Sequence, residues 1–322
     1  VVIFAYYMMD TLLPVDKLIG RLYPLFGVAL LFMAAGLLVY MLFSGIEIPA
    51  GISEGFGNRY PGDADSHPIF PMMFVSIACG AISGFHATQS PMMARCMTSE
   101  KWARPIFYGA MVAEGAVALI WAAAAIAFTG SYETLGDYMA AHGNSAGALV
   151  HDISVGWLGT AGGLLAILGV VAAPVTTGDT ALRSARLIIA DSLGFSQASI
   201  GRRLAVSIPV FAIAGAVMMI DFSVLWRYFA WSNQTLSVFT LWAVTVWLAR
   251  RGNMFWIPMI PALFMTVVCV SYILFAPSPE GFGIDLTIAT GCGALVAALF
   301  AVLFFRKLGA LRSGATLIPA EE

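Results

Sequence analysis

The stretch LTIATGCGALVAALFAVLFF, residues 286–305, decides the fold class, because it runs for twenty residues without a charged side chain. An α-helix needs about 20 mostly apolar residues to cross the roughly 30 Å hydrocarbon layer of a bilayer. Arg306 and Lys307 follow at once, and basic residues of this kind mark the cytoplasmic end of a span. The stretch therefore predicts a transmembrane helix.

The composition of the whole chain agrees with this prediction. Of 322 residues, 60% are apolar and only 11% are charged, whereas a soluble domain carries about 25% charged residues. The mean hydropathy of +0.87 and the net charge of −2 argue against a soluble globule, a secreted scaffold, a disordered chain and a nucleic-acid binder. The cysteines form no CxxC pair, so we interpret them as small packing residues without a disulfide or zinc site. They are Cys79, Cys96, Cys269 and Cys292.

We expect an all-α polytopic membrane protein, a transmembrane helical bundle, that forms a single domain over residues 1–322. Residue 1 is a valine and the first residues are apolar, which predicts a fragment that begins inside a truncated first helix, 1–13. Eight further apolar stretches have spanning length. They are residues 23–44, 69–94, 105–129, 155–175, 204–220, 229–249, 255–276 and 286–305.

The basic residues orient these spans. All of the 16 Lys and Arg residues except Arg59 and Arg227 fall in alternate connections, which the positive-inside rule places in the cytoplasm. The opposite connections, 46–68, 130–154 and 277–285, are acidic and rich in glycine and proline. This alternation supports the predicted number of spans.

Polar and helix-weakening residues interrupt the apolar stretch 69–94. They are Gly80, Ser83, Gly84, His86, Thr88, Gln89, Ser90 and Pro91. A helix broken near 84–91 would expose backbone N–H and C=O groups, which form the central sites of many secondary transporters. We therefore take Ser83, Gly84, His86, Thr88, Gln89 and Ser90 as candidate substrate ligands. The alternative is that the span ends before them and the polar run only caps its cytoplasmic end.

Glu114 is the second candidate, because it lies nine residues after Pro105, about 14 Å along a helix and near the bilayer centre. An intramembrane charge costs at least about 2.5–3.5 kcal/mol, so it needs a reason. Burial disfavours the charged form of a carboxyl group, and a group that takes up a proton there suits proton coupling. The alternative is a protonated Glu that makes one interhelical hydrogen bond.

The third candidate is the stretch AAPVTTGDTALRSAR, residues 172–186. Thr176 and Thr177 lie between Pro174 and Gly178 at the end of a span, and we take both as candidate substrate ligands. Asp179 lies four residues before Arg183, a spacing that puts both on one helix face. We take this pair as candidate proton-coupling residues. The alternative is an interfacial salt bridge with a threonine that caps a new helix.

A fourth, weaker candidate is WRYFAWSNQ, residues 226–234. Its aromatic residues are typical of a membrane interface. Asn233 and Gln234 lie further into the span, where they either contact substrate or bridge helices. The chain has no Walker A, HExxH or GxSxG motif, so no ATP coupling, bound metal or cofactor is expected.

Three segments resemble those of the carbon starvation protein (CstA) family. They are FPMMFVSIACGAISGFHATQSPMMAR (70–95), GDTALRSARLIIADSLG (178–194) and WRYFAWSNQTLS (226–237), and DTLLPVDKLIGRLYPLFG (10–27) is similar to the shorter members. The resemblance implies a transporter of the bacterial or archaeal inner membrane that takes up peptides, or pyruvate with protons, under carbon limitation. It also implies the inverted-repeat core of amino acid–polyamine–organocation transporters.

Two departures from the family pattern fall in candidate substrate regions. ATQSPMM stands where many long members have SSGTT, and WRYFAWSNQ replaces the common WPLFG-x-x-NQ. Both peptide and small-carboxylate substrates therefore stay open. A membrane nutrient sensor and, less favoured, an intramembrane metal-dependent enzyme are the alternatives to transport. The expected partners are the small-molecule substrate, a coupling proton and the lipid bilayer, without nucleic acid; the sequence does not indicate an oligomeric state.

Overall fold

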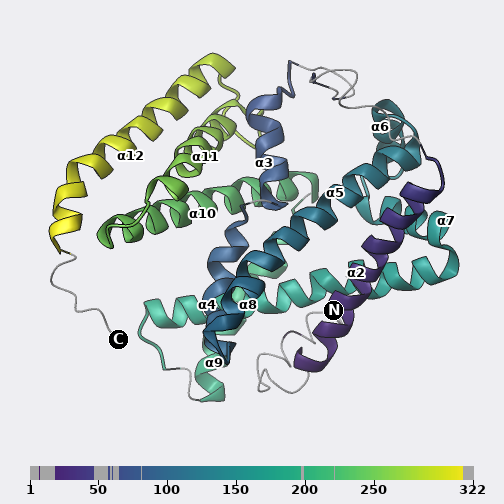
Figure 1. The fold of residues 1–322 in the computed structure, drawn as a ribbon, viewed down its shortest axis with the longest axis horizontal. Coiled ribbons are helices and arrows are strands. Elements are labelled where there is room, and N and C mark those ends of the chain that lie inside the picture. Colours follow the sequence, from purple (N-terminus) through teal and green to yellow (C-terminus); the bar gives the residue numbers. More distant parts are fainter. Residues whose placement is uncertain are drawn as a thin grey trace. The chain divides into compact units, whose positions relative to one another are not determined.

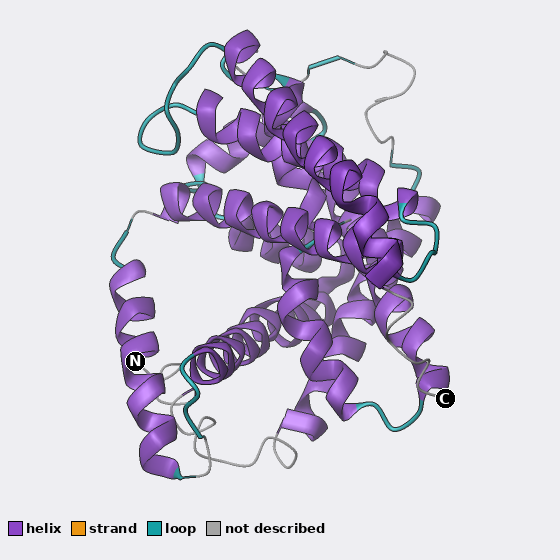
Figure 2. Ribbon diagram, turned by 90° about the vertical axis from the view of Figure 1, so that its left-hand side faces the viewer, coloured by secondary structure: helices purple, strands orange, loops and turns teal. Residues whose placement is uncertain are grey.

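The computed structural model describes residues 7, 19–46, 57–58, 60, 65–80, 82–196, 199–220 and 222–314. Every regular element within these residues is a helix, as Figures 1 and 2 show. This confirms the predicted all-α fold class. Six helical stretches among the described residues are long and apolar enough to cross a membrane. They are Pro24–Phe43, Glu100–Thr129, Ala146–Val170, Ile200–Val217, Trp256–Phe275 and Leu286–Gly309.

The chain divides into two compact units that are discontinuous in sequence. The first unit is made of Val1–Ser66 and Met97–Gly215, and the second of His67–Cys96 and Ala216–Glu322. The interrupted segment near residue 84 therefore packs with the C-terminal part of the chain rather than with its immediate sequence neighbours. The predicted first helix, 1–13, lies outside the described residues except for Tyr7.

The first unit packs around one apolar core. Its helices are α2 (Ile19–Phe43), η3 (Glu100–Trp102), η4 (Arg104–Gly109), α5 (Ala110–Thr129), α6 (Tyr132–Ala141), α7 (Ala146–Ala166), η5 (Ile167–Val171), α8 (Ala172–Ser192) and most of α9 (Ile200–Val217). Met33 and Leu37 of α2, Ala124 of α5 and Ile153 of α7 are fully buried together. Lipid tails are as apolar as these side chains, so van der Waals packing of this face holds α2 against α5 and α7 within a membrane.

The turn between α5 and α6 shows how local sequence sets these boundaries. Gly130 ends α5 in the left-handed region at φ +87°, and its N–H donates to the carbonyl of Ile126, a conformation that glycine adopts at low cost. Ser131 then caps α6, because its hydroxyl accepts from the N–H of Thr134 at 3.1 Å. The glycine that ends α5 and the serine that caps α6 are adjacent, so one helix ends and the next begins within two residues.

The second unit contains a broken segment and three long helices. Its elements are η1 (Ile69–Met73), α3 (Phe74–Ile77), η2 (Ala78–Gly80), α4 (Gly84–Cys96), α10 (Phe222–Arg250), α11 (Trp256–Phe275) and α12 (Leu286–Gly314). Helices α10, α11 and α12 pack as successive neighbours (Figure 1). Val75 of α3 joins Val268 and Tyr272 of α11 in the core. A Cβ on Gly293 of α12 would lie 2.6 Å from the Ser271 hydroxyl, so glycine allows α12 to approach α11 closely.

Candidate functional site

The candidate site lies where the segment 69–96 stops being helical. Helical geometry ends at Gly80, is absent at Ile82 and Ser83, and resumes at Gly84. The sequence predicts a break near 84–91, and the structure has the break immediately before this range. Residues 84–91 form the first turns of α4, including Pro91.

Asn233 on α10 caps the start of α4 from a distance of 150 residues along the chain. The N–H of Phe85 donates to Asn233 Oδ1 at 3.1 Å and to Ser83 Oγ at 3.2 Å. Asn233 Nδ2 in turn donates to Ser83 Oγ at 3.2 Å. Ser83 is 5% exposed and Asn233 is 6% exposed, so these contacts replace water for groups that a helix start leaves unpaired.

Gly84 allows this contact because it has no side chain. A Cβ there would lie 2.8 Å from Asn233 Oδ1 and 2.9 Å from the Cβ of Leu236, and nearer still to the backbone oxygen of Asn233. Ordinary van der Waals contact begins near 3.4 Å. Glycine therefore brings the α4 start directly against the α10 backbone.

The remaining predicted ligands of this region lie close in sequence to the cap. His86, Thr88, Gln89 and Ser90 are all half-buried on α4. Thr88 Oγ1 donates to the carbonyl of Phe85 at 3.1 Å. The buried Nε2 of Gln89 has no hydrogen-bond partner within the described part of the chain. Gln234 is fully buried next to Asn233.

The predicted proton-coupling residues belong to the other unit. Glu114 lies in the middle of α5 and is exposed. On α8, Thr177 is exposed and Arg183 is buried at 6% exposure. The side chains of Thr176 and Asp179 lie outside the described residues. The structure therefore brings the 83–90 and 233–234 candidates into one unit and keeps the acidic candidates in the other.

Sequence reasoning missed a second interruption, inside α7. Gly159 takes φ 64° and ψ −155° within the helix, a left-handed conformation that favours glycine. A Cβ on Gly162 would meet the backbone oxygen of Ser154. The glycine-rich run GWLGTAGG, residues 156–163, was the available signal, since glycines weaken a helix.

An ion pair at the predicted external side was also missed. Arg227 Nε lies 2.9 Å from Glu280 Oε1, and the two side chains are 42% and 6% exposed. The hydroxyl of Tyr228 donates to the carbonyl of Pro279 beside it. The signal was the placement of Arg227, an isolated external basic residue, opposite the acidic segment 277–285.

The six apolar helices among the described residues fit a multi-pass protein of the cytoplasmic membrane. The sequence model of the family described as "Carbon starvation protein CstA" matches residues 1–161 and 145–272. The chain belongs to this family, as its sequence motifs indicated.

Individual relatives match parts of the chain. An "Uncharacterized membrane protein" of Haemophilus influenzae is 45% identical over 154 residues, 44% of this chain and 41% of the relative. A "Peptide transporter CstA" of Campylobacter jejuni is 37% identical over 76 residues, 23% of this chain and 10% of the relative. A "Pyruvate/proton symporter BtsT" of Escherichia coli is 47% identical over 53 residues, 16% and 7% of the two chains. This chain thus spans less than half the length of each of these relatives. No solved structure matches the chain.

Proposed function

We propose that this chain forms part of a secondary-active transporter that takes up short peptides or a small carboxylate such as pyruvate, coupled to protons. The family supports membrane transport, since its named relatives are peptide transporters and a pyruvate/proton symporter. The observation that carries the proposal is the helix break at Ile82 and Ser83, capped by Asn233 within a membrane-embedded unit.

The start of α4 suits a carboxylate, which peptides and pyruvate share. The N-terminus of a helix carries a partial positive charge, and broken helices direct such ends at anionic groups of substrates. In our proposal Ser83 and Gly84 form the break, and His86, Thr88, Gln89 and Ser90 line the substrate path. The buried Nε2 of Gln89, which has no hydrogen-bond partner in the described part of the chain, would gain one from the substrate.

Proton coupling is assigned to Glu114, Asp179 and Arg183. Glu114 is the acidic residue within the apolar stretch 110–129, where a charged side chain is rare and often functional. Asp179 precedes Arg183 by one helical turn on α8, a spacing that suits an ion pair; in our proposal the two residues pair in one state, and a proton on Asp179 ends that pairing in the other. Gln234 beside Asn233 completes the proposed polar lining in the second unit, and Thr176 and Thr177 in the first turns of α8 are proposed as separate substrate ligands in the first unit.

Uptake of labelled pyruvate and of a labelled dipeptide tests this proposal, in cells that express the intact protein with and without a proton uncoupler. We expect accumulation of one substrate that is lost with the uncoupler and in His86→Ala. Glu114→Gln should abolish proton-driven accumulation, whereas Glu133→Gln, an exposed acid on α6, should not. Full coupled uptake by Glu114→Gln would exclude the coupling role. Binding of a substrate without accumulation would favour the sensor.

A further inference from the structure

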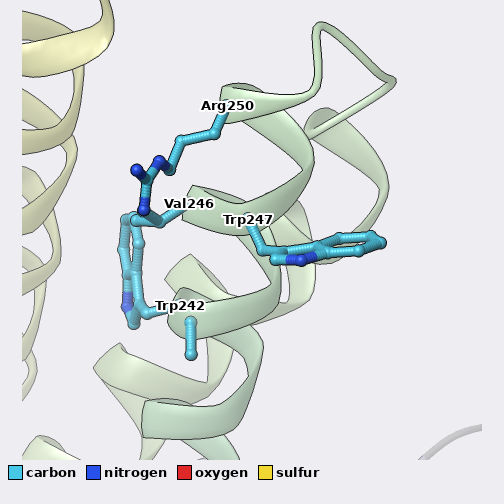
Figure 3. Close-up of a pocket in the computed structure, with 5 residues that line it drawn as sticks. Trp242, Val246, Trp247 and Arg250 are labelled. Atoms are coloured by element: carbon cyan, nitrogen blue, oxygen red, sulfur yellow. The ribbon is translucent and has the colours of Figure 1, made fainter. Parts of the chain in front are cut away.

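A pocket of about 460 Å³ lies on α10 near its C-terminal end, and transport does not account for it. It is lined by Trp242, Ala243, Val246, Trp247 and Arg250. Figure 3 shows the Arg250 side chain turned back along the helix toward Val246 and the indole of Trp242. The lining is thus apolar along the helix and cationic at one end.

A second arginine strengthens the positive charge at this end. The Arg251 guanidinium lies 4.3 Å from the centroid of the Trp247 ring, within the range of a cation–π contact. Arg250 and Arg251 are both exposed, and Trp247 is 51% exposed. Both arginines belong to the connections that the charge pattern places on the cytoplasmic side.

We propose that this pocket binds an anionic phospholipid of the cytoplasmic leaflet. Arg250, which lines the pocket, would hold its phosphate while Arg251 adds positive charge beside it, and one acyl chain would lie against Trp242, Ala243 and Val246. The charge of the pocket selects this occupant: a zwitterionic lipid has no net charge to attract the two arginines, and a soluble anion would leave the apolar wall uncovered. Basic residues next to a membrane span on the cytoplasmic side attract anionic head groups in this way.

The proposed lipid would touch a residue that joins three helices. Trp242 Nε1 donates to Thr266 Oγ1 of α11 at 3.1 Å, and its ring packs at 5.8 Å from the ring of Phe300 on α12. A lipid that covers the outer side of Trp242 therefore supports the packing of α10, α11 and α12. We expect it to raise the thermal stability of the protein, because a ligand that binds only the folded state stabilises it.

Native mass spectrometry of the intact protein in detergent tests this proposal, with phosphatidylglycerol titrated against phosphatidylcholine. Each basic residue near a membrane surface adds to the free energy of binding to anionic lipid. The double variant Arg250→Gln with Arg251→Gln should therefore weaken phosphatidylglycerol binding about 30-fold. Ala243→Phe keeps both charges but fills the pocket, so it should also weaken binding. Arg202→Gln with Arg203→Gln removes two charges from the other unit, on the same predicted side, and should leave binding unchanged.

Three results would overturn the proposal. Phosphatidylglycerol binding could be unchanged when Arg250 and Arg251 are replaced. It could fall equally in the Arg202 and Arg203 control, which would indicate a general charge effect. An Ala243→Cys variant could form a disulfide between two copies, which would show that protein covers the pocket. The two arginines are exposed, so their replacement leaves folding intact and keeps the test decisive even where Ala243→Phe disturbs packing.

Discussion

Asn233 Oδ1 on α10 accepts a 3.1 Å hydrogen bond from the backbone N–H of Phe85, in the first turn of α4. The contact joins two segments that are 148 residues apart and belong to the same unit. It makes the start of α4 depend on a side chain of another helix. Any change at Asn233 therefore acts on the proposed substrate site through the backbone of α4.

Replacement of Asn233 by alanine should destabilise the second unit and reduce uptake. The change removes the partner of Ser83 and one acceptor of the Phe85 N–H, and an unsatisfied buried polar group costs about 1–3 kcal/mol. Thermal unfolding in detergent measures the first effect, and labelled uptake the second. The control is Ser232→Ala, because Ser232 is the exposed neighbour of Asn233 on α10. Equal unfolding temperatures for the two variants would contradict the capping role.

Gly84→Ala should be more harmful than an ordinary helical glycine replacement. Its Cβ would lie 2.8 Å from Asn233 Oδ1 and 2.9 Å from Leu236, and such overpacking costs about 1–3 kcal/mol. Gly291 on α12 has nothing within 4 Å of its Cβ position, so Gly291→Ala should be neutral or stabilising by up to about 1 kcal/mol. We expect Gly84→Ala to unfold at a lower temperature than Gly291→Ala. The reverse order would show that α4 can move away from α10.

Much of this architecture follows from local sequence. Apolar stretches of spanning length predict membrane helices because the bilayer imposes that length on each segment separately. An interruption near 84–91 was predictable because clustered glycine and polar residues weaken a helix wherever they occur, and the structure places it just before this range, at Ile82 and Ser83. Family membership was likewise predictable, because the motif 70–95 is contiguous.

Contacts between distant segments were not predictable from the sequence. The amide of Asn233 is as compatible with a substrate as with a helix start, and only the fold brings it to Ser83, 150 residues away. The Arg227–Glu280 pair depends on the loop 276–285 folding back over the start of α10. Local composition predicts neither the Asn233–Ser83 contact nor the Arg227–Glu280 pair, because both arise from tertiary packing.

The Arg227–Glu280 pair should show a strong asymmetry between single and double variants. Arg227→Gln leaves Glu280 buried at 5% exposure without its cation, which is costly. Because Arg227 is 42% exposed, solvent screens the pair and reduces the cost to about 1–3 kcal/mol. Addition of Glu280→Gln to the Arg227→Gln variant should restore most of the lost stability. A double-mutant cycle of unfolding temperatures measures the coupling, and strictly additive effects would show that the pair contributes nothing.

Alkaline pH should weaken the contact between α6 and α7 through Tyr138. Its hydroxyl donates to Asp152 Oδ2 at 2.5 Å, and this bond, followed by desolvation and the charge of Asp152, raises the pKa of Tyr138 from 10.0 to about 12. The raised pKa means that the folded state holds the phenol proton more tightly than the unfolded state. The resulting stabilisation is fully present below pH 10 and is lost as the pH rises through 12.

The measurement is the difference in unfolding temperature between wild-type protein and Tyr138→Phe as a function of pH. We expect a constant difference below pH 10 that changes between pH 10 and 12, because the wild-type protein alone loses this stabilisation there. Asp152→Asn should lower the upper end of this range towards pH 10 and reduce the size of the change, since it removes the charge that opposes ionisation of the phenol in the folded state and leaves the pKa of the unfolded state the same. Tyr132→Phe on the same helix is the control and should follow the wild-type profile. Parallel profiles of wild type and Tyr138→Phe across this range would exclude a role for the Tyr138–Asp152 bond in stability.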